Sequence, residues 1–343
     1  MQYEVTIGIP VYRAVGYIRQ TMESALCQTF PSIEFLIVDD CGEDGSIAVV
    51  EKIQQAHPRG KDIRIVSHCR NLGVGVARNR ILSEARGRYL YFLDSDDIME
   101  PETISKFVSV MHKYDADVIY GSWKRVDKVN QSPSKDYIYP YQELLKPDSL
   151  AMFAFKNYSS FRISVCNCLM DVSFLREENL QFIDTAYWED LAFTYEMVTR
   201  VKRSILLPDV TYQYLCRPGS LSHYQDREVL QKNEILNNAQ TIHYLKEKSL
   251  GLAKEPYIPY LCYNLEMNSF YIICHILKNR YRIKPEITLA EMHGIIRHPM
   301  DLKDILGFRK KLFQNILFWL ISRMPSYLSV SIIGLLGRIK MIL

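Results

Sequence analysis

The sequence lacks the features that mark several common classes of protein. Its apolar stretches near the C-terminus fall short of the roughly 18 to 20 residues needed to cross a bilayer. Its eight cysteines are scattered, without the spacing of a disulfide framework or a paired zinc site. It has no Gly-x-x-x-x-Gly-Lys loop for nucleoside triphosphates. We therefore expect neither a membrane-spanning protein, a disulfide-rich protein nor a triphosphatase.

The excess of one sign of charge is also small, since 42 Lys and Arg residues nearly balance 39 Asp and Glu residues and leave a formal net charge of only +3. No basic stripe interleaved with aromatic residues runs along the N-terminal part of the chain, so we expect no nucleic-acid partner. The C-terminus differs, because no acidic residue follows Asp304. The basic residues beyond it are Arg309, Lys310, Lys311, Arg323, Arg338 and Lys340. This asymmetry predicts that the C-terminal part of the chain lies against an anionic surface of a partner.

The composition, 48% hydrophobic and 24% charged, is that of an ordered globular protein. Residues 1–10 lead directly into strand-like sequence, with neither a charged leader nor an apolar signal core, so we expect a cytoplasmic protein. Strand and helix signals alternate up to about residue 225, and helical periodicity dominates from there on. We expect a sheet domain at 1–225 and a helical region at 226–343.

The N-terminal pattern predicts an open α/β sheet covered by helices. The expected strands lie at 5–9, 34–38, 63–67, 89–93 and 118–120. The expected helices lie at 17–26, 46–56, 76–83 and 101–113, and a polar, proline-containing loop is expected at 127–148. In such a sheet, ligands bind beyond the carboxyl ends of the strands.

The ends of the expected strands deliver Asp39, Asp40, Asp94, Asp96 and Asp97 to one edge of the sheet. Carboxylates that converge in this way are costly unless a positive charge is bound there. Mg²⁺ and Mn²⁺ take oxygen ligands of this kind, often together with substrate phosphates. An acidic turn in which Asp97 caps the following helix is the alternative, and the residues alone leave both open.

An ordered series of motifs resembles the family 2 glycosyltransferases of the GT-A fold. These are VTIGIPVY at 5–12, FLIVDD at 35–40, DGS at 44–46, NLG at 71–73, ARN at 77–79, YFLDSDD at 91–97 and WEDLAF at 188–193. The resemblance covers about residues 3 to 224. It implies a mostly parallel, Rossmann-like GT-A sheet, to which the helical periodicity after about residue 225 adds a helical C-terminal extension. It also implies an inverting hexosyltransferase that uses a nucleoside diphosphate sugar, commonly a UDP-sugar.

The resemblance assigns roles at the donor site. Pro10, Tyr12 and Asp40 should line the pocket for the nucleotide base and ribose. Asp94 should lie near the ribose, and Asp96 should bind Mn²⁺ or Mg²⁺.

The later motifs supply the remaining candidates. Asp190 matches the family's catalytic base, whereas from the residues alone Glu189 and Asp190 equally suit the acidic first turn of a helix. Arg217 and His223 fall where such enzymes often have a segment that closes over the diphosphate. Arg is well shaped for phosphate, and a neutral His can join a metal shell, so we expect Arg217 at the donor and His223 at the metal.

Two functions from other classes remain as alternatives. The Gly73-Val74-Gly75 turn, with Asp94 about the right distance onward, imitates a nicotinamide-binding fingerprint, although it lies too far after the preceding strand. A catalytically silent sugar-binding or scaffold protein would keep the same fold. Retained carboxylates at Asp96 and Asp190 count against the silent protein.

The apolar stretches at 312–321 and 327–342 are separated by Arg323 and Pro325. They suit a pair of helices that lie on an anionic membrane, with aromatic residues at the headgroup boundary. We therefore expect a peripheral protein on the inner face of the cell membrane, with a saccharide or lipid-linked acceptor. The alternative is that these helices only pack on the rest of the chain.

Overall fold

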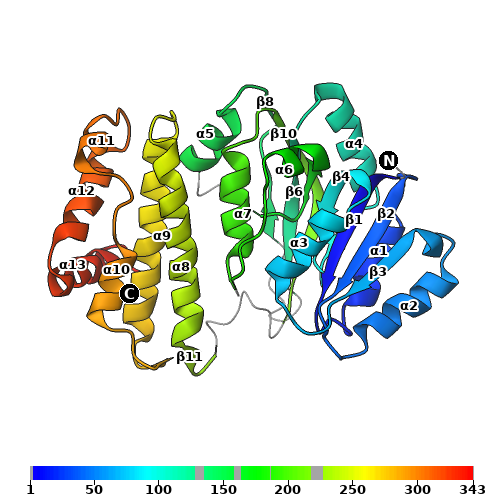
Figure 1. The fold of residues 1–343 in the computed structure, drawn as a ribbon, viewed down its shortest axis with the longest axis horizontal. Coiled ribbons are helices and arrows are strands. Elements are labelled where there is room, and N and C mark those ends of the chain that lie inside the picture. The colour runs from blue at the N-terminus through cyan, green and yellow to red at the C-terminus, as the bar shows by residue number, and fades with distance from the viewer. Residues whose placement is uncertain (1–2, 128–134, 158–163, 186, 218–226, 343) are drawn as a thin grey trace. The chain divides into compact units, whose positions relative to one another are not determined.

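The computed structural model describes residues 3–127, 135–157, 164–185, 187–217 and 227–342 (Figure 1). The chain divides into two compact units. The first contains the described residues of Met1–Leu150, Ser160–Asp184 and Glu189–Pro218. The second contains those of Ala151–Ser159, Thr185–Trp188 and Gly219–Leu343.

The first unit is built on a mixed sheet. Its strands are β1 (Tyr3–Val11), β2 (Ile33–Asp39), β3 (Ile63–Ser67), β4 (Gly87–Phe92), β5 (Ile98–Met99), β6 (Val118–Asp127), β7 (Lys135–Tyr137), β8 (Gln142–Leu144), β9 (Cys168–Asp171) and β10 (Ser204–Cys216). In the described residues they follow the order β3-β2-β1-β4-β9-β6-β10-β5, with β7 on β6 and β8 on β10. The strands from β3 to β4 are parallel, as expected, whereas β9 runs antiparallel to both neighbours.

Helices cover both faces of this sheet. They are α1 (Ile18–Leu26), α2 (Ser46–Ala56), α3 (Val74–Glu84), α4 (Thr103–Tyr114), α6 (Val172–Glu177) and α7 (Glu189–Val198). Alternation along β1 sends Val5, Ile7 and Ile9 into one core cluster with residues of α1 and α4. The opposite face meets α3, where a Cβ on Gly8 would lie 2.3 Å from Ile81. Glycine at position 8 therefore lets α3 approach the sheet.

The expected loop at 127–148 is in part wrong, because β7 and β8 lie within it. β7 pairs antiparallel with β6, and β8 pairs antiparallel with β10. Trp123 of β6 stacks on Tyr137 of β7 with ring centroids 4.1 Å apart. β8 is stabilised by a strand far along the chain and β7 by the nearby β6, and the local polar composition reveals neither pairing.

The second unit is helical. It contains most of α5 (Ser149–Lys156), together with α8 (Lys232–Ser249), α9 (Ile258–Asn279), α10 (Leu289–Ile295), α11 (Leu302–Leu306), α12 (Leu312–Arg323) and α13 (Ser326–Ile339). The short strands β11 (Leu230–Gln231) and β12 (Ile283–Lys284) pair in parallel. The long helix α9 packs against α8, α12 and α13. None of the helices in the described ranges is long and apolar enough to cross a membrane.

Candidate active site

The carboxyl ends of β1, β2 and β4 meet at one edge of the sheet. These strands are parallel neighbours, and backbone bonds continue their register beyond the last paired residues. The amide of Asp40 donates to the Val11 carbonyl (2.9 Å), and the amide of Leu93 donates to the Gly8 carbonyl (3.0 Å). The structure thus brings the acidic residues that follow β2 and β4 to the same edge, as the sequence predicted.

Asp40 is a buried carboxylate that organises the loop before α3. Its oxygens accept hydrogen bonds from the amides of Leu72 (2.9 Å) and Gly73 (2.8 Å). The ring Nδ1 of His68 lies 2.8 Å from the same carboxylate. Gly73 has a φ of 93°, a conformation that favours glycine. Asp40 therefore fixes the backbone that leads into α3.

Pro10 and Tyr12 differ in their surroundings. Pro10 is buried within β1, where it pairs with Val38 of β2. Tyr12 follows the strand and is exposed, and the Arg13 guanidinium lies 5.2 Å from the centre of its ring. An accessible aromatic face and a cation thus stand together at the end of β1.

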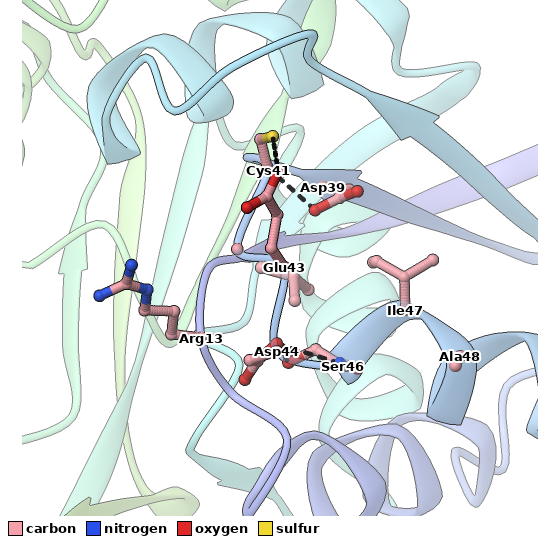
Figure 2. A pocket seen from close by; sticks show the side chains of 11 residues that line it. Arg13, Asp39, Cys41, Glu43, Asp44, Ser46, Ile47 and Ala48 are labelled. Atoms are coloured by element: carbon pink, nitrogen blue, oxygen red, sulfur yellow. Dashed lines mark hydrogen bonds between the residues drawn. The ribbon is translucent and has the colours of Figure 1, made fainter.

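A small cavity of about 150 Å³ lies between the loops that follow β1 and β2 (Figure 2). Arg13 lies on one side of it, and Ile47 and Ala48 lie on the other. Asp44 joins the two loops, because its carboxylate accepts from the amides of both Val15 (2.9 Å) and Ser46 (3.0 Å). This volume is below the range of about 300 to 1,000 Å³ typical of ligand sites, so the cavity can hold only part of a ligand.

The Asp97 carboxylate is buried and bound to β10. It accepts from the Tyr212 hydroxyl (2.6 Å) and the Leu215 amide (2.8 Å). The alternative in which Asp97 caps the following helix is therefore wrong, because Glu102 is the N-terminal cap residue of α4. That helix begins at Thr103, and Pro101 lies in the turn before it. Asp97 instead fixes the acidic turn to the neighbouring strand.

Asp94 and Asp96 are the carboxylates in this turn that pair with arginines. Asp94 accepts from Arg78 (2.8 Å), and Asp96 is ion-paired with Arg217. Burial and the nearby Asp94 raise the pKa of Asp96, although Arg217 lowers it. Burial, Asp94 and Asp96 raise the pKa of Asp97 well above its usual value. A cation at this turn would relieve the repulsion that these shifts report.

The residues of this turn fit a divalent cation in their chemistry. Carboxylate oxygens are the ligands that Mg²⁺ and Mn²⁺ prefer, and one or two suffice when substrate phosphates complete the shell. In the described parts of the chain, no three His, Cys, Asp or Glu side chains are already arranged around a metal position. Asp94 and Asp96 are thus candidates that would need oxygen ligands from a bound substrate.

Arg217 directly follows β10 and is the last residue described before residue 227. Besides pairing with Asp96, its guanidinium lies 5.1 Å from the centre of the Tyr17 ring. Arg217 is therefore beside the acidic turn, as a phosphate-binding residue would need to be. His223, predicted as a metal ligand, lies outside the described residues.

Arg78 of α3 connects the acidic turn to α7. Its guanidinium is buried and donates to Asp94 (2.8 Å) and to Glu189 (2.5 Å). Burial opposes the charge, but these two carboxylates raise the pKa of Arg78 well above its usual value. The guanidinium also lies 5.6 Å from the centre of the Phe182 ring. The sequence motif at 77–79 contained this residue, but no sequence pattern assigned it the role of a bridge.

Asp190 lies in the first turn of α7, next to Glu189. Its side chain accepts from the Leu191 amide (2.7 Å). Burial raises the pKa of Asp190, and Arg78 opposes that shift. Burial and Asp190 raise the pKa of Glu189 to about 7. A carboxyl group with a raised pKa suits proton transfer near neutral pH, although the same position in the helix is what an acidic first turn requires.

We expect Arg78→Met to destabilise the fold, because it leaves Glu189 buried without its ion partner. Removing one member of a buried ion pair typically costs about 3 to 5 kcal/mol of unfolding free energy. Urea unfolding measures this change. Arg88→Met is the matched control, since Arg88 is exposed and lies 3.8 Å from Asp171, so its loss should cost no more than about 1 kcal/mol. Equal losses in the two variants would show that Arg78 is not a buried bridge.

The chain is similar to known proteins in sequence and in structure. The sequence profile described as "Glycosyl transferase family 2" matches residues 6–178. The chain is 38% identical over 107 residues to the putative teichuronic acid biosynthesis glycosyltransferase TuaG of Bacillus subtilis, covering 31% of this chain and 41% of TuaG. It is 27% identical over 225 residues to the succinoglycan biosynthesis protein ExoO of Rhizobium meliloti, covering 64% of this chain and 62% of ExoO. Both alignments span less than two thirds of the relative.

Two solved structures resemble the whole chain. One is S. aureus TarS 1-349 in complex with UDP-GlcNAc, with a TM-score of 0.71 and 18% identity, covering 98% of this chain and 92% of that one. The other is the mannosyltransferase PcManGT of Pyrobaculum calidifontis in complex with GDP-Man and Mn²⁺, with a TM-score of 0.54 and 14% identity, covering 98% and 88%. At these identities the likeness concerns the fold, which is GT-A.

Proposed function

Because the chain belongs to glycosyl transferase family 2, we propose that it is an inverting hexosyltransferase that uses a nucleoside diphosphate sugar. The donor is most simply a UDP-sugar, and the acceptor is a hydroxyl of a saccharide or of a lipid-linked saccharide. The TarS complex with UDP-GlcNAc supports the choice of donor. Relatives named for teichuronic acid and succinoglycan biosynthesis support a role in making cell-surface polysaccharide.

The observation that carries this proposal is the bridge made by Arg78. It joins Asp94, in the acidic turn, to Glu189, at the start of the helix that holds Asp190. If the acidic turn binds the donor and Asp190 accepts the proton, this bridge would hold both in one arrangement, which a transfer reaction requires.

In the proposed reaction, an acceptor oxygen bonds to the anomeric carbon while the bond from that carbon to the diphosphate oxygen breaks. Attack opposite the leaving group inverts the anomeric centre. Asp190 takes the proton of the acceptor hydroxyl. Asp96 would hold Mn²⁺ or Mg²⁺, which when bound neutralises charge on the leaving diphosphate, and Asp94 would lie near the ribose. Arg217 would bind the diphosphate, and Pro10, Tyr12 and Asp40 would form the side of the site that receives the base and ribose.

The proposal includes a location. We propose that the enzyme is cytoplasmic and works as a peripheral protein on the inner face of the cell membrane. A lipid-linked acceptor would confine the reaction to that surface. His223, together with Asp96, remains our proposed metal ligand.

A panel of nucleotide sugars tests the donor. We expect slow, Mn²⁺-dependent release of UDP from one UDP-sugar without any acceptor, because water can replace the acceptor hydroxyl. Free nucleoside diphosphate is measured with a coupled assay, and chelation of the metal is the control. Binding without release for every sugar would instead favour a catalytically silent sugar-binding protein. Failure to bind any nucleotide would contradict both.

The nicotinamide-dependent alternative has no support in the geometry. The amide of Gly73 already donates to Asp40 (2.8 Å) and to Asn71 (2.9 Å). A phosphate-binding turn needs such an amide to be available for the ligand.

A further inference from the structure

Helices α12 and α13 expose apolar side chains at helical spacing. On α12, Phe313, Leu317 and Leu320 recur three and four residues apart and share one face. Phe313 is 75% exposed. On α13, Leu335 and Ile339 are also four residues apart, and they are 59% and 70% exposed. Exposed apolar groups at such regular spacing mark an interaction surface rather than scattered surface residues.

The opposite faces of the two helices are committed to the interior of the second unit. Asn315 is fully buried, and its side-chain amide donates to the Pro259 carbonyl of α9 (3.0 Å). Its side-chain oxygen lies 3.1 Å from Nε2 of the buried His298. Ile321 and Ile333 are buried as well. Each helix is therefore anchored on one side and presents its apolar stripe on the other.

The charged residues on and next to α12 and α13 in the sequence are all basic, although Arg323 at the end of α12 lies 3.9 Å from the exposed Asp301. Arg309 and Lys310 are exposed immediately before α12, and Arg338 and Lys340 are exposed at the end of α13. No acidic residue follows Asp304 in the sequence. Aromatic and apolar groups beside cations match the boundary of an anionic lipid layer, where apolar side chains enter the acyl region and cations meet the phosphates.

We propose that the exposed faces of α12 and α13 form a docking surface for an anionic lipid layer. A second copy of this chain fits less well, because a symmetric contact would place the same cations against each other. The exposure of the apolar side chains and the positive charges beside them identify these faces as a docking surface. Its purpose, which is to bring the enzyme to a lipid-linked acceptor, rests on the proposed function.

Co-sedimentation of the full chain with vesicles tests the surface. We expect binding to vesicles of phosphatidylcholine with phosphatidylglycerol at low salt, and little binding to phosphatidylcholine alone. High salt should release the protein, since the screening length falls from about 30 Å at 0.01 M to about 3 Å at 1 M. Phe313→Ser, Leu317→Ser and Leu320→Ser combined should weaken binding at least about tenfold. Arg309→Glu with Lys310→Glu should weaken it by about fivefold or more per position.

Matched substitutions on the same unit serve as controls. Tyr281→Ser with Leu289→Ser removes two other exposed apolar side chains, and Lys254→Glu with Lys284→Glu reverses two other exposed charges. Both controls should bind vesicles normally, and circular dichroism checks that every variant is folded. If the variant with the three α12 substitutions binds vesicles as strongly as the unaltered protein, the proposal is overturned. It is also overturned if the unaltered protein does not bind vesicles at low salt. If the unaltered protein self-associates but does not bind vesicles, and only the variant with the three α12 substitutions loses this self-association, the surface belongs to a contact with a second copy. UDP binding, measured separately, shows whether the proposed function fails independently.

Discussion

Asp190→Asn is expected to lower turnover by about 10² to 10⁴ while donor binding stays intact, as the loss of a general base predicts. Asparagine keeps the size of the side chain and can still accept from the Leu191 amide, which Asp190 does at 2.7 Å. It cannot take a proton from an acceptor hydroxyl near neutral pH. The fall should therefore appear in kcat, with UDP affinity unchanged by calorimetry.

The pH profile adds a second readout for Asp190. Burial raises the pKa of this carboxyl above its ordinary value. Turnover of the unaltered enzyme should therefore fall as pH drops through that raised pKa, because the protonated form is no base. The Asn variant should lose this limb of the profile. Near-normal turnover in the variant would return Asp190 to the role of an acidic first turn.

Glu196→Gln is the matched control for this experiment. Glu196 lies on the same helix, α7, and its carboxylate pairs with Arg200 at 2.9 Å one turn further on. Loss of that charge should leave turnover and the pH profile unchanged. If both variants lose activity equally, the effect comes from the stability of α7 and not from proton transfer.

The sequence was most informative where its signals are local. Alternation along 5–9 predicted a strand that the structure extends to Tyr3–Val11, and the helix at 46–56 has the expected bounds. The acidic residues after β2 and β4 could be placed at one edge because parallel strands end together. These predictions depend on periodicity and chain direction, which a single sequence contains.

What the sequence could not provide are contacts between distant segments. Arg78 and Glu189 are 111 positions apart, yet they share a hydrogen bond of 2.5 Å. The sequence left a helix cap open as one alternative for Asp97, because Asp is favoured there, whereas its partners Tyr212 and Leu215 lie on a strand far along the chain. In both cases the tertiary pairing outweighs the local preference, and only the fold reveals it.

The role of Asp96 follows from its charge environment. Its carboxylate shares one turn with Asp94 and Asp97, and burial and Asp94 raise its pKa. Arg217 is its ion partner in the described residues. If Asp96 binds a divalent cation together with a donor diphosphate, the cation replaces part of the positive charge that this turn requires. Metal affinity and donor affinity should then be coupled through this side chain.

Asp96→Ala should abolish the Mn²⁺-dependent part of UDP binding while the protein stays folded. Losing partners outside the metal's own ligand shell already costs about 10- to 100-fold in affinity, so loss of a ligand should cost at least that much. Calorimetric titration of UDP with and without Mn²⁺ measures the difference, and urea unfolding checks the fold. Glu102→Ala is the control, because Glu102 is an exposed acid a few residues onward and pairs only weakly with Lys106, at 3.7 Å. If Mn²⁺ strengthens UDP binding equally in all three proteins, Asp96 does not bind the metal, and its pairing with Arg217 is the whole of its role.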